Sequence, residues 1–420
     1  MKKERINEKL FSFIEKSPSP FHAIKNCEEI LGEKGYTKLK ENEEWVLTPQ
    51  GKYFVTRNDS SLIAFSIPEG TFQGFHMAAA HSDSPCFKLK ENMEMDVEKS
   101  YTKLNVEPYG GMVYSSWFDR PLSIAGRIVT KEGTRLVNLE KDSLIIPNMA
   151  IHLNREINKG YAYNPQVDLL PLFSGKADEK GLISHLAKMC DVKKEEVLGH
   201  DLYVYARQTP SYVGMNKEFI YAPRLDDLQC VFGLVTAMAE ENPCEYVNVC
   251  AIFDNEEVGS STKQGADSTF LEDVLERIAE CFYLGKGAFK QKLAGSFLIS
   301  ADNGHALHPN HPEKSDPTNR PVLNGGIIIK YNANQKYTTD GVSAAKIKEL
   351  CQEAKVPFQT YVNRSDEPGG ATLGNISTAH ISVNAADIGL PQLAMHCSVE
   401  TAGSEDTVYL YKMMKTYYGG

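Results

Sequence analysis

One stretch constrains the fold of this chain more than any other: an apolar run that ends at two adjacent glutamates. Residues 246–252 are largely apolar, which predicts a buried strand. Glu256 and Glu257 follow that strand, and residues 260–262 indicate a turn and the start of a helix. Because open α/β sheets bind ligands beyond the carboxyl ends of their strands, this order predicts an α/β fold with a site at that edge.

The two glutamates are expected to have different roles, because neighbouring side chains at a strand end diverge. One of them can hold a metal ion while the other handles a proton. A solvated acidic turn would explain an isolated Glu-Glu pair equally well. The rest of the chain decides between these two interpretations.

Composition and charge exclude several classes of protein. The chain has 420 residues, which suits two domains, and a formal net charge of −10. Nucleic acids and anionic membranes bind basic faces, so neither is an expected partner. The N-terminus lacks the apolar core of a signal peptide, and no apolar run is long enough to span a bilayer. The nine cysteines are scattered without a CxxC motif, so we expect a cytoplasmic protein with reduced thiols.

The order of the predicted elements indicates two domains, one inserted into the other. Residues 91–217 are rich in short strands and turns, with one helix near 180–189, which indicates an inserted β-rich domain. Residues 1–90 and 218–420 would form a split α/β domain with a sheet sandwiched by helices. Its predicted helices are 3–16, 21–31, 270–282, 344–354 and 405–418. Its predicted strands are 62–67, 75–81, 246–252, 297–302, 326–331, 358–362 and 392–396.

Side chains that can bind metal ions follow several of these strands. His81, Asp302 and His396 each end a predicted strand. Asp226 and Asp227 lie in the first turn of a predicted helix. Alone, each has a structural explanation, such as an acidic helix N-terminus or a core histidine. Together with the Glu-Glu pair, they suit a pair of zinc, manganese or cobalt ions, because a single structural zinc more often uses cysteine.

The chain resembles the aspartyl aminopeptidase family of co-catalytic metallopeptidases nearly from end to end. The most specific part of the resemblance is FDNEEVGS at 253–260 combined with SADNGHALHPNH at 300–311. It extends through SPSPFHA at 17–23, AAHSDSP at 79–85, WFDRPLSIAGR at 117–127, IPNMAIHLNR at 146–155, APRLDDL at 222–228 and PQLAMHCSVE at 391–400. The resemblance implies a mixed sheet of the zinc-peptidase type, an inserted dimerisation domain, peptide substrates and a homo-oligomer, often a dodecamer.

By this resemblance, five residues bind two divalent ions, with zinc expected and manganese or cobalt as alternatives. His81 and Asp302 would bind one ion. Glu257 and His396 would bind the other, and Asp226 would bridge the two. Two close cations lower the pKa of a shared water towards neutrality. The expected reaction is removal of an N-terminal residue from a peptide.

Three further residues would complete the catalytic site. Glu256 would be the general base by the resemblance, taking a proton from the water and passing it to the leaving amine. Asp83 can accept the second ring N–H of His81 and fix its tautomer. His152 is similar to a family histidine that reaches into the site of a neighbouring subunit. Asp227 stands where the family usually has Asn, which adds a negative charge beside the bridging residue.

Substrate specificity depends on cations that a net-negative chain must place locally. The family name implies an acidic N-terminal residue, and Lys330 and Arg364 are the candidates to bind its side chain. Asp366 could bind the free α-amino group. Two alternatives stay open: the same site acting on neutral N-terminal residues, or a non-catalytic assembly protein on a peptidase scaffold.

Overall fold

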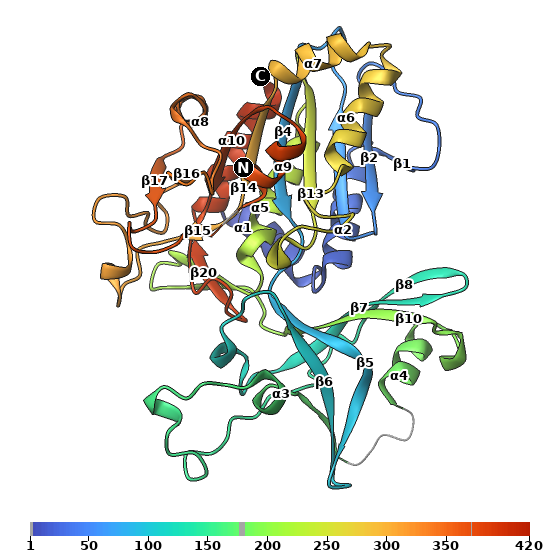
Figure 1. Ribbon diagram of the computed structural model, residues 1–420, viewed down its shortest axis with the longest axis vertical. Helices are drawn as coiled ribbons and strands as arrows, with labels where there is room; N and C mark the ends of the chain where they lie inside the picture. The colour runs from blue at the N-terminus through green and yellow to red at the C-terminus, as the bar shows by residue number, and fades with distance from the viewer. Residues whose placement is uncertain (1–2, 176–180, 371) are drawn as a thin grey trace. The chain divides into compact units, whose positions relative to one another are not determined.

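The computed structural model describes residues 3–175, 181–370 and 372–420, and it divides into two compact units. The first unit comprises Met1–Asp83, Pro210–Met395 and Glu400–Gly420. The second comprises Ser84–Thr209 and His396–Val399. The sequence suggested boundaries at 90–91 and 217–218, and it kept 396–399 with the main domain. Each unit is described here by itself (Figure 1).

A nine-stranded mixed sheet forms the centre of the first unit (Figure 1). Its strands are, in spatial order, β1 (Thr37–Leu39), β2 (Lys52–Arg57), β3 (Ser61–Ser66), β13 (Val247–Phe253), β4 (Phe75–His81), β14 (Phe297–Ala301), β18 (Asn384–Gly389), β16 (Ile327–Tyr331) and β17 (Phe358–Val362). The four adjacent strands β13, β4, β14 and β18 run parallel to one another. Their carboxyl ends therefore meet at one edge of the sheet.

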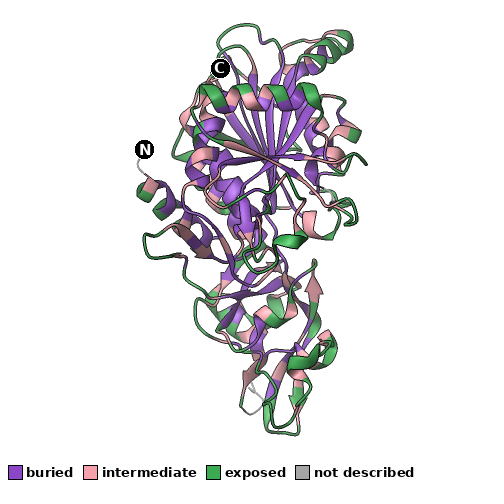
Figure 2. Cartoon of the chain, turned by 90° about the vertical axis from the view of Figure 1, so that its left-hand side faces the viewer, coloured by how far each residue is buried: buried purple, intermediate pink, exposed green. Residues whose placement is uncertain are grey.

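Helices cover both faces of this sheet, and alternate side chains of its central strands enter two different cores. Ala78 and Ala80 pack with the helices α1 (Lys3–Glu15), α2 (Pro20–Gly32), α5 (Leu225–Glu240), α8 (Gly341–Glu353) and α10 (Asp406–Gly419). Met77 and Ala79 pack in the opposite core with α6 (Phe270–Cys281), α7 (Lys286–Ala294) and α9 (Leu373–His380). Figure 2 shows the strands as a buried layer between helices that are exposed on their outer sides. The predicted α/β sandwich is confirmed.

Two smaller sheets complete the architecture. A five-stranded sheet in the first unit has the order β11 (Ser211–Val213), β12 (Phe219–Ala222), β20 (Glu400–Gly403), β19 (Pro391–Leu393), β15 (Gly304–His305). The second unit has a six-stranded antiparallel sheet in the order β8 (Gly133–Asn138), β7 (Leu122–Thr130), β10 (Gly199–Ala206), β5 (Cys86–Val97), β6 (Tyr101–Tyr109), β9 (Leu172–Ser174). Its helices are α3 (Pro165–Asp168) and α4 (Gly181–Met189), so the helix expected near 180–189 is present from 181 onwards.

The structure differs from three local predictions in detail. No helix starts at 260–262, because a short 3₁₀ turn (Glu256–Val258) and a loop precede α6. Asp226 and Asp227 lie in the first turn of α5, as predicted, but their backbone angles are not helical, and the peptide bond between them is cis. The run 392–396 is not a strand that ends in histidine, because β19 ends at Leu393 and His396 has a left-handed φ of 64°. Among the described residues, no helix is long and apolar enough to cross a membrane.

Candidate metal centre

His81 lies at the centre of a buried cluster where the parallel strands end. It is the last residue of β4, which lies between β13 and β14. Its Nε2 atom is 3.4 Å from Asp226 Oδ1 and 3.9 Å from Asp302 Oδ1. Glu256 Oε2 lies 4.0 Å from the same nitrogen. Residues that are far apart in the sequence thus face one imidazole, as the strand-end argument predicted.

The donor atoms of this cluster fit a divalent cation. One donor atom from each of His81, Asp226, Asp227 and Asp302 lies within 4.8 Å of every other, and all four side chains are buried. His81 forms a second such group with Glu256 and Glu257. Buried like charges repel strongly unless a counter-charge compensates them. Imidazole nitrogen and carboxylate oxygen are the ligands of catalytic zinc, so the chemistry of the donor set matches such an ion.

Asp83 fixes the geometry of this cluster without lying in either donor group. Its carboxylate oxygens accept hydrogen bonds from the backbone N–H groups of Glu256 (3.1 Å) and Glu257 (3.2 Å). Its Oδ1 also lies 3.4 Å from His81 Nδ1, and its backbone oxygen lies 3.1 Å from that nitrogen. Asp83 therefore fixes the ring of His81 and the turn that carries both glutamates.

The electrostatics of the cluster reflect a buried site that is crowded with carboxylates. Burial raises the pKa of Glu256 to about 7, and Asp302 and Asp83 add to this effect while His81 opposes it. Burial likewise raises the pKa of Asp302, against the opposing charge of Lys330. Burial alone would lower the pKa of His81, but hydrogen bonds with Asp226 and Asp83 raise it well above its usual value. A bound cation would reverse this balance by favouring the ionised carboxylates and the neutral imidazole.

Lys330 is buried against this cluster rather than exposed at a pocket surface. It lies on β16 and is 2% exposed. Its Nζ donates a hydrogen bond to Asn303 O at 2.9 Å and lies 3.4 Å from Asp302 Oδ2. The predicted substrate cation is therefore close to the candidate metal centre, and its contact with substrate stays a prediction.

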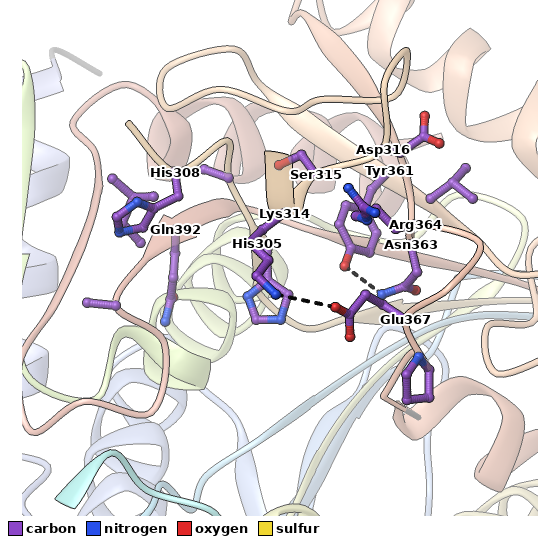
Figure 3. Close-up of a pocket in the computed structure, with 15 residues that line it drawn as sticks. His305, His308, Lys314, Ser315, Asp316, Tyr361, Asn363, Arg364, Glu367 and Gln392 are labelled. Carbon is purple, nitrogen blue, oxygen red and sulfur yellow. Dashed lines mark hydrogen bonds and ion pairs between the residues drawn. The ribbon is translucent and has the colours of Figure 1, made fainter. Parts of the chain in front are cut away.

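Arg364 and Asp366, the other predicted substrate residues, pair with each other. Arg364 Nε is 2.8 Å from Asp366 Oδ1, and Nη2 is 2.7 Å from Oδ2. Arg364 lines a cavity of about 400 Å³ together with His305, Lys314 and Gln392 (Figure 3). The pair is partly exposed to solvent, unlike the residues around His81.

The remaining two predicted residues, His152 and His396, belong to the second unit. His152 is exposed. His396 Nδ1 lies 2.8 Å from Gly111 O, within the same unit. Their positions relative to the cluster around His81 stay predictions.

Sequence reasoning missed two buried residues that contact the segments of this cluster. Asn303 follows Asp302, and its side-chain amide donates hydrogen bonds to Gln392 Oε1 (2.6 Å) and Gln229 Oε1 (3.0 Å). Glu400 Oε2 accepts a hydrogen bond from the backbone N–H of Asp226 at 3.0 Å. The only sequence signal for Glu400 was its place at the end of the motif at 391–400.

A mixed α/β sheet with histidine and carboxylates at its parallel strand ends is typical of a metal-dependent hydrolase. Comparison with known proteins makes the class specific: a model of the family described as Aminopeptidase I zinc metalloprotease (M18) matches residues 13–418. The chain therefore belongs to the M18 family and is a metalloaminopeptidase. The expected membership of the aminopeptidase family is confirmed.

Relatives support this assignment over most of their length. A probable M18 family aminopeptidase 2 from Clostridium acetobutylicum is 45% identical over 423 residues, which cover 98% of each chain. A protein of the same name from Pseudomonas aeruginosa is 40% identical and also covers 98% of each chain. Among solved structures, the chain matches an Ape4–Nbr1 complex at a TM-score of 0.95 with 34% identity, covering 99% of this chain and 86% of the other. A yeast mApe1 dodecamer matches at 0.86 with 26% identity, covering 99% and 96%.

Proposed function

We propose that this aminopeptidase uses two divalent metal ions and removes acidic N-terminal residues, Asp or Glu, from peptides. The proposal is carried by the surroundings of His81. Its Nε2 atom faces carboxylates from three separate segments of the chain. A single structural zinc more often uses thiolates. A donor set this rich in carboxylates therefore supports a pair of ions.

Five residues would hold the ions. His81 and Asp302 would bind one ion, and Glu257 and His396 would bind the other. Asp226 would lie between them. The family description supports zinc, and the oxygen-rich donors would also accept manganese or cobalt. When bound, the ions would supply a water of lowered pKa and polarise the carbonyl of the scissile bond.

Glu256 would act as general base. Its carboxylate lies at the edge of the cluster and is more exposed than His81, so it can reach both water and substrate. It would accept a proton from the attacking water and donate it to the leaving amine. Asp83 would keep Glu256 in place through the backbone N–H bond at 3.1 Å.

Lys330 is the stronger of the two candidates for recognition of an acidic side chain. Its ammonium is buried next to Asp302, where electrostatic attraction is little screened by water. Arg364 is already neutralised by Asp366 and is screened by solvent. Asp366 would bind the substrate α-amino group only if its pair with Arg364 opened.

We also propose that the protein assembles into a homo-oligomer, with residues 91–217 as the oligomerisation domain. The related yeast mApe1 forms a dodecamer. In this chain, Met149, Ile151 and Leu153 are 48%, 47% and 79% exposed, and they flank His152. An apolar segment of this kind suits a subunit contact, through which His152 would enter a neighbouring site. The proposed location is the cytoplasm, which suits the free cysteines of the described residues.

The test is hydrolysis of Asp, Glu and Leu anilides after metal removal and stepwise add-back of zinc, manganese or cobalt. We expect activity to return when two ions are bound per chain, and the acidic substrates to react fastest. The variant Glu256→Gln should bind the same metal and lose on the order of 10³-fold or more in kcat, because it lacks the base.

Each proposal has a result that would contradict it. Preference for Leu would refute the acidic pocket and favour a broad aminopeptidase. Full activity with one ion per chain would refute the two-metal mechanism. Near-normal turnover of Glu256→Gln would exclude Glu256 as the base, and a wild-type protein that bound metal without hydrolysing any substrate would favour a non-catalytic assembly role.

A further inference from the structure

The backbone at Asp226 has an unusual course that requires an external hydrogen-bond acceptor. Asp226 has φ −83° and ψ 106°, and Asp227 has φ −119° and ψ 20°, so neither residue is helical. Arg224, two residues earlier, has a left-handed φ of 57°. The N–H of Asp226 therefore lies in a distorted first turn of α5, and a buried N–H in such a position must find a partner. That partner is Glu400 Oε2, at 3.0 Å.

Strand pairing explains why Glu400 lies next to Asp226. The antiparallel strands β12 and β20 pair Ala222 with Glu400. The chain leaves β12 at Ala222 and reaches Asp226 four residues later, still beside the start of β20. Glu400 is 1% exposed, so its carboxylate lies out of contact with bulk water. A buried charge is costly, and hydrogen bonds of this kind are what compensate it.

Asp83 shows the same arrangement at another segment of the cluster. Its two oxygens accept the backbone N–H groups of Glu256 and Glu257. Neither Asp83 nor Glu400 contributes to the groups of metal-type donor atoms found among the described residues. Both are buried carboxylates that bind the backbone beside a proposed ligand. The sequence predicted this kind of role for Asp83 but not for Glu400.

We propose that Glu400 is a positioning residue for the metal centre, which holds the Asp226 backbone so that the Asp226 carboxylate faces His81. This inference rests on the proposed metal-binding role of Asp226. The 3.4 Å approach of Asp226 Oδ1 to His81 Nε2 depends on the backbone that carries Asp226. Without an acceptor for its N–H, that backbone can turn, and the donor atom leaves its place. Partners that orient metal ligands typically contribute 10- to 100-fold to metal affinity.

The test separates the hydrogen bond from the charge with three substitutions of Glu400. Glu400→Gln keeps an acceptor oxygen at the same reach and loses the charge. Glu400→Asp keeps the charge but moves the oxygen away from Asp226 N–H. Glu400→Met keeps the size and has neither. Zinc affinity of the metal-depleted full-length protein is measured by competition with a chromogenic chelator, alongside kcat/KM for Asp, Glu and Leu anilides.

We expect Glu400→Met to lose roughly 10- to 100-fold in zinc affinity. Glu400→Gln should lose the least and Glu400→Asp should fall between them. The values of kcat/KM at limiting zinc should fall by the same factor for all three substrates, because Glu400 acts through Asp226 and not on the substrate side chain. If Glu400→Met does not fold, the positioning role is tested by the zinc affinities of the other two variants, of which Glu400→Gln should bind more tightly than Glu400→Asp.

Asp406→Ala provides a matched control. Asp406 is also a buried carboxylate that accepts backbone N–H bonds, from Asn324 (2.7 Å) and Gly326 (3.0 Å), but none of these residues is a proposed ligand. This variant should melt at a lower temperature and keep wild-type zinc affinity.

Wild-type zinc affinity in Glu400→Met would overturn the positioning role, and so would tighter zinc binding by Glu400→Asp than by Glu400→Gln. Failure of the wild-type protein to bind zinc would instead refute the proposed function.

Discussion

Two groups of side chains in the first unit each combine carboxylates with a basic side chain, but the pKa values of their carboxylates shift in opposite directions. Around His81, burial is the largest influence, and it raises the pKa of Glu256 to about 7. In the Arg364–Asp366 pair, the hydrogen bond from Arg364 is the largest influence, and it lowers the pKa of Asp366 to about 2. His81 is 1% exposed, whereas the side chain of Asp366 is 65% exposed. The difference shows that burial raises the pKa of a carboxylate, whereas a hydrogen bond from an exposed arginine lowers it.

The largest expected effect comes from removing the central imidazole of the buried group. His81→Ala should lose one of the two proposed metal ions and on the order of 10³-fold or more in kcat/KM, because the Nε2 atom of His81 faces Asp226, Glu256 and Asp302 together. Metal content by elemental analysis and anilide hydrolysis measure the two effects.

His380→Ala is the matched control for that experiment. His380 also pairs with a carboxylate, Asp267, at 2.9 Å, but both side chains are partly exposed. Its activity and metal content should equal those of the wild type. Retention of both ions in His81→Ala would contradict the assignment of the buried group as a metal centre.

An intermediate effect is expected at Lys330. This residue is buried like the carboxylates around His81, but its side chain is positively charged. Lys330→Met should lower the ratio of kcat/KM for Asp over Leu anilides by roughly 10- to 100-fold, because a hydrogen bond to a charged group contributes about 1.5–3 kcal/mol. The ratio is the decisive measurement, since loss of the contact with Asp302 would slow both substrates alike. Lys346→Met is the control, because that half-buried lysine lies on α8 over the Phe297 ring.

An unchanged Asp-to-Leu ratio in Lys330→Met would remove Lys330 from substrate recognition. It would leave the contact with Asp302 as its role. The same experiment therefore tests whether a buried cation beside the metal centre can also recognise a substrate.

The sequence could predict the strand-end residues because their signals are local. An apolar run that ends in His81, or just before Asp302 or Glu256, indicates both the strand and the place of the polar side chain. Asp226 was assigned to the wrong backbone conformation, because two aspartates before an apolar helix normally indicate an acidic N-terminus. Glu400 escaped prediction because its contact with Asp226 joins residues 174 positions apart and depends on the pairing of β12 with β20.

The smallest expected effect belongs to the exposed pair. Arg364→Ala should stay within about fivefold of the wild type in kcat/KM for acidic and neutral anilides, because solvent-exposed ion pairs contribute little. Asp366→Ala should behave in the same way if the pair is only a surface contact beside the cavity of Figure 3. A selective loss of acidic substrates in Arg364→Ala would show that the guanidinium leaves Asp366 to bind substrate. That result would assign recognition of the acidic side chain to the exposed Arg364 and not to the buried Lys330. Burial would then not distinguish the charged residues that bind substrate from those that do not.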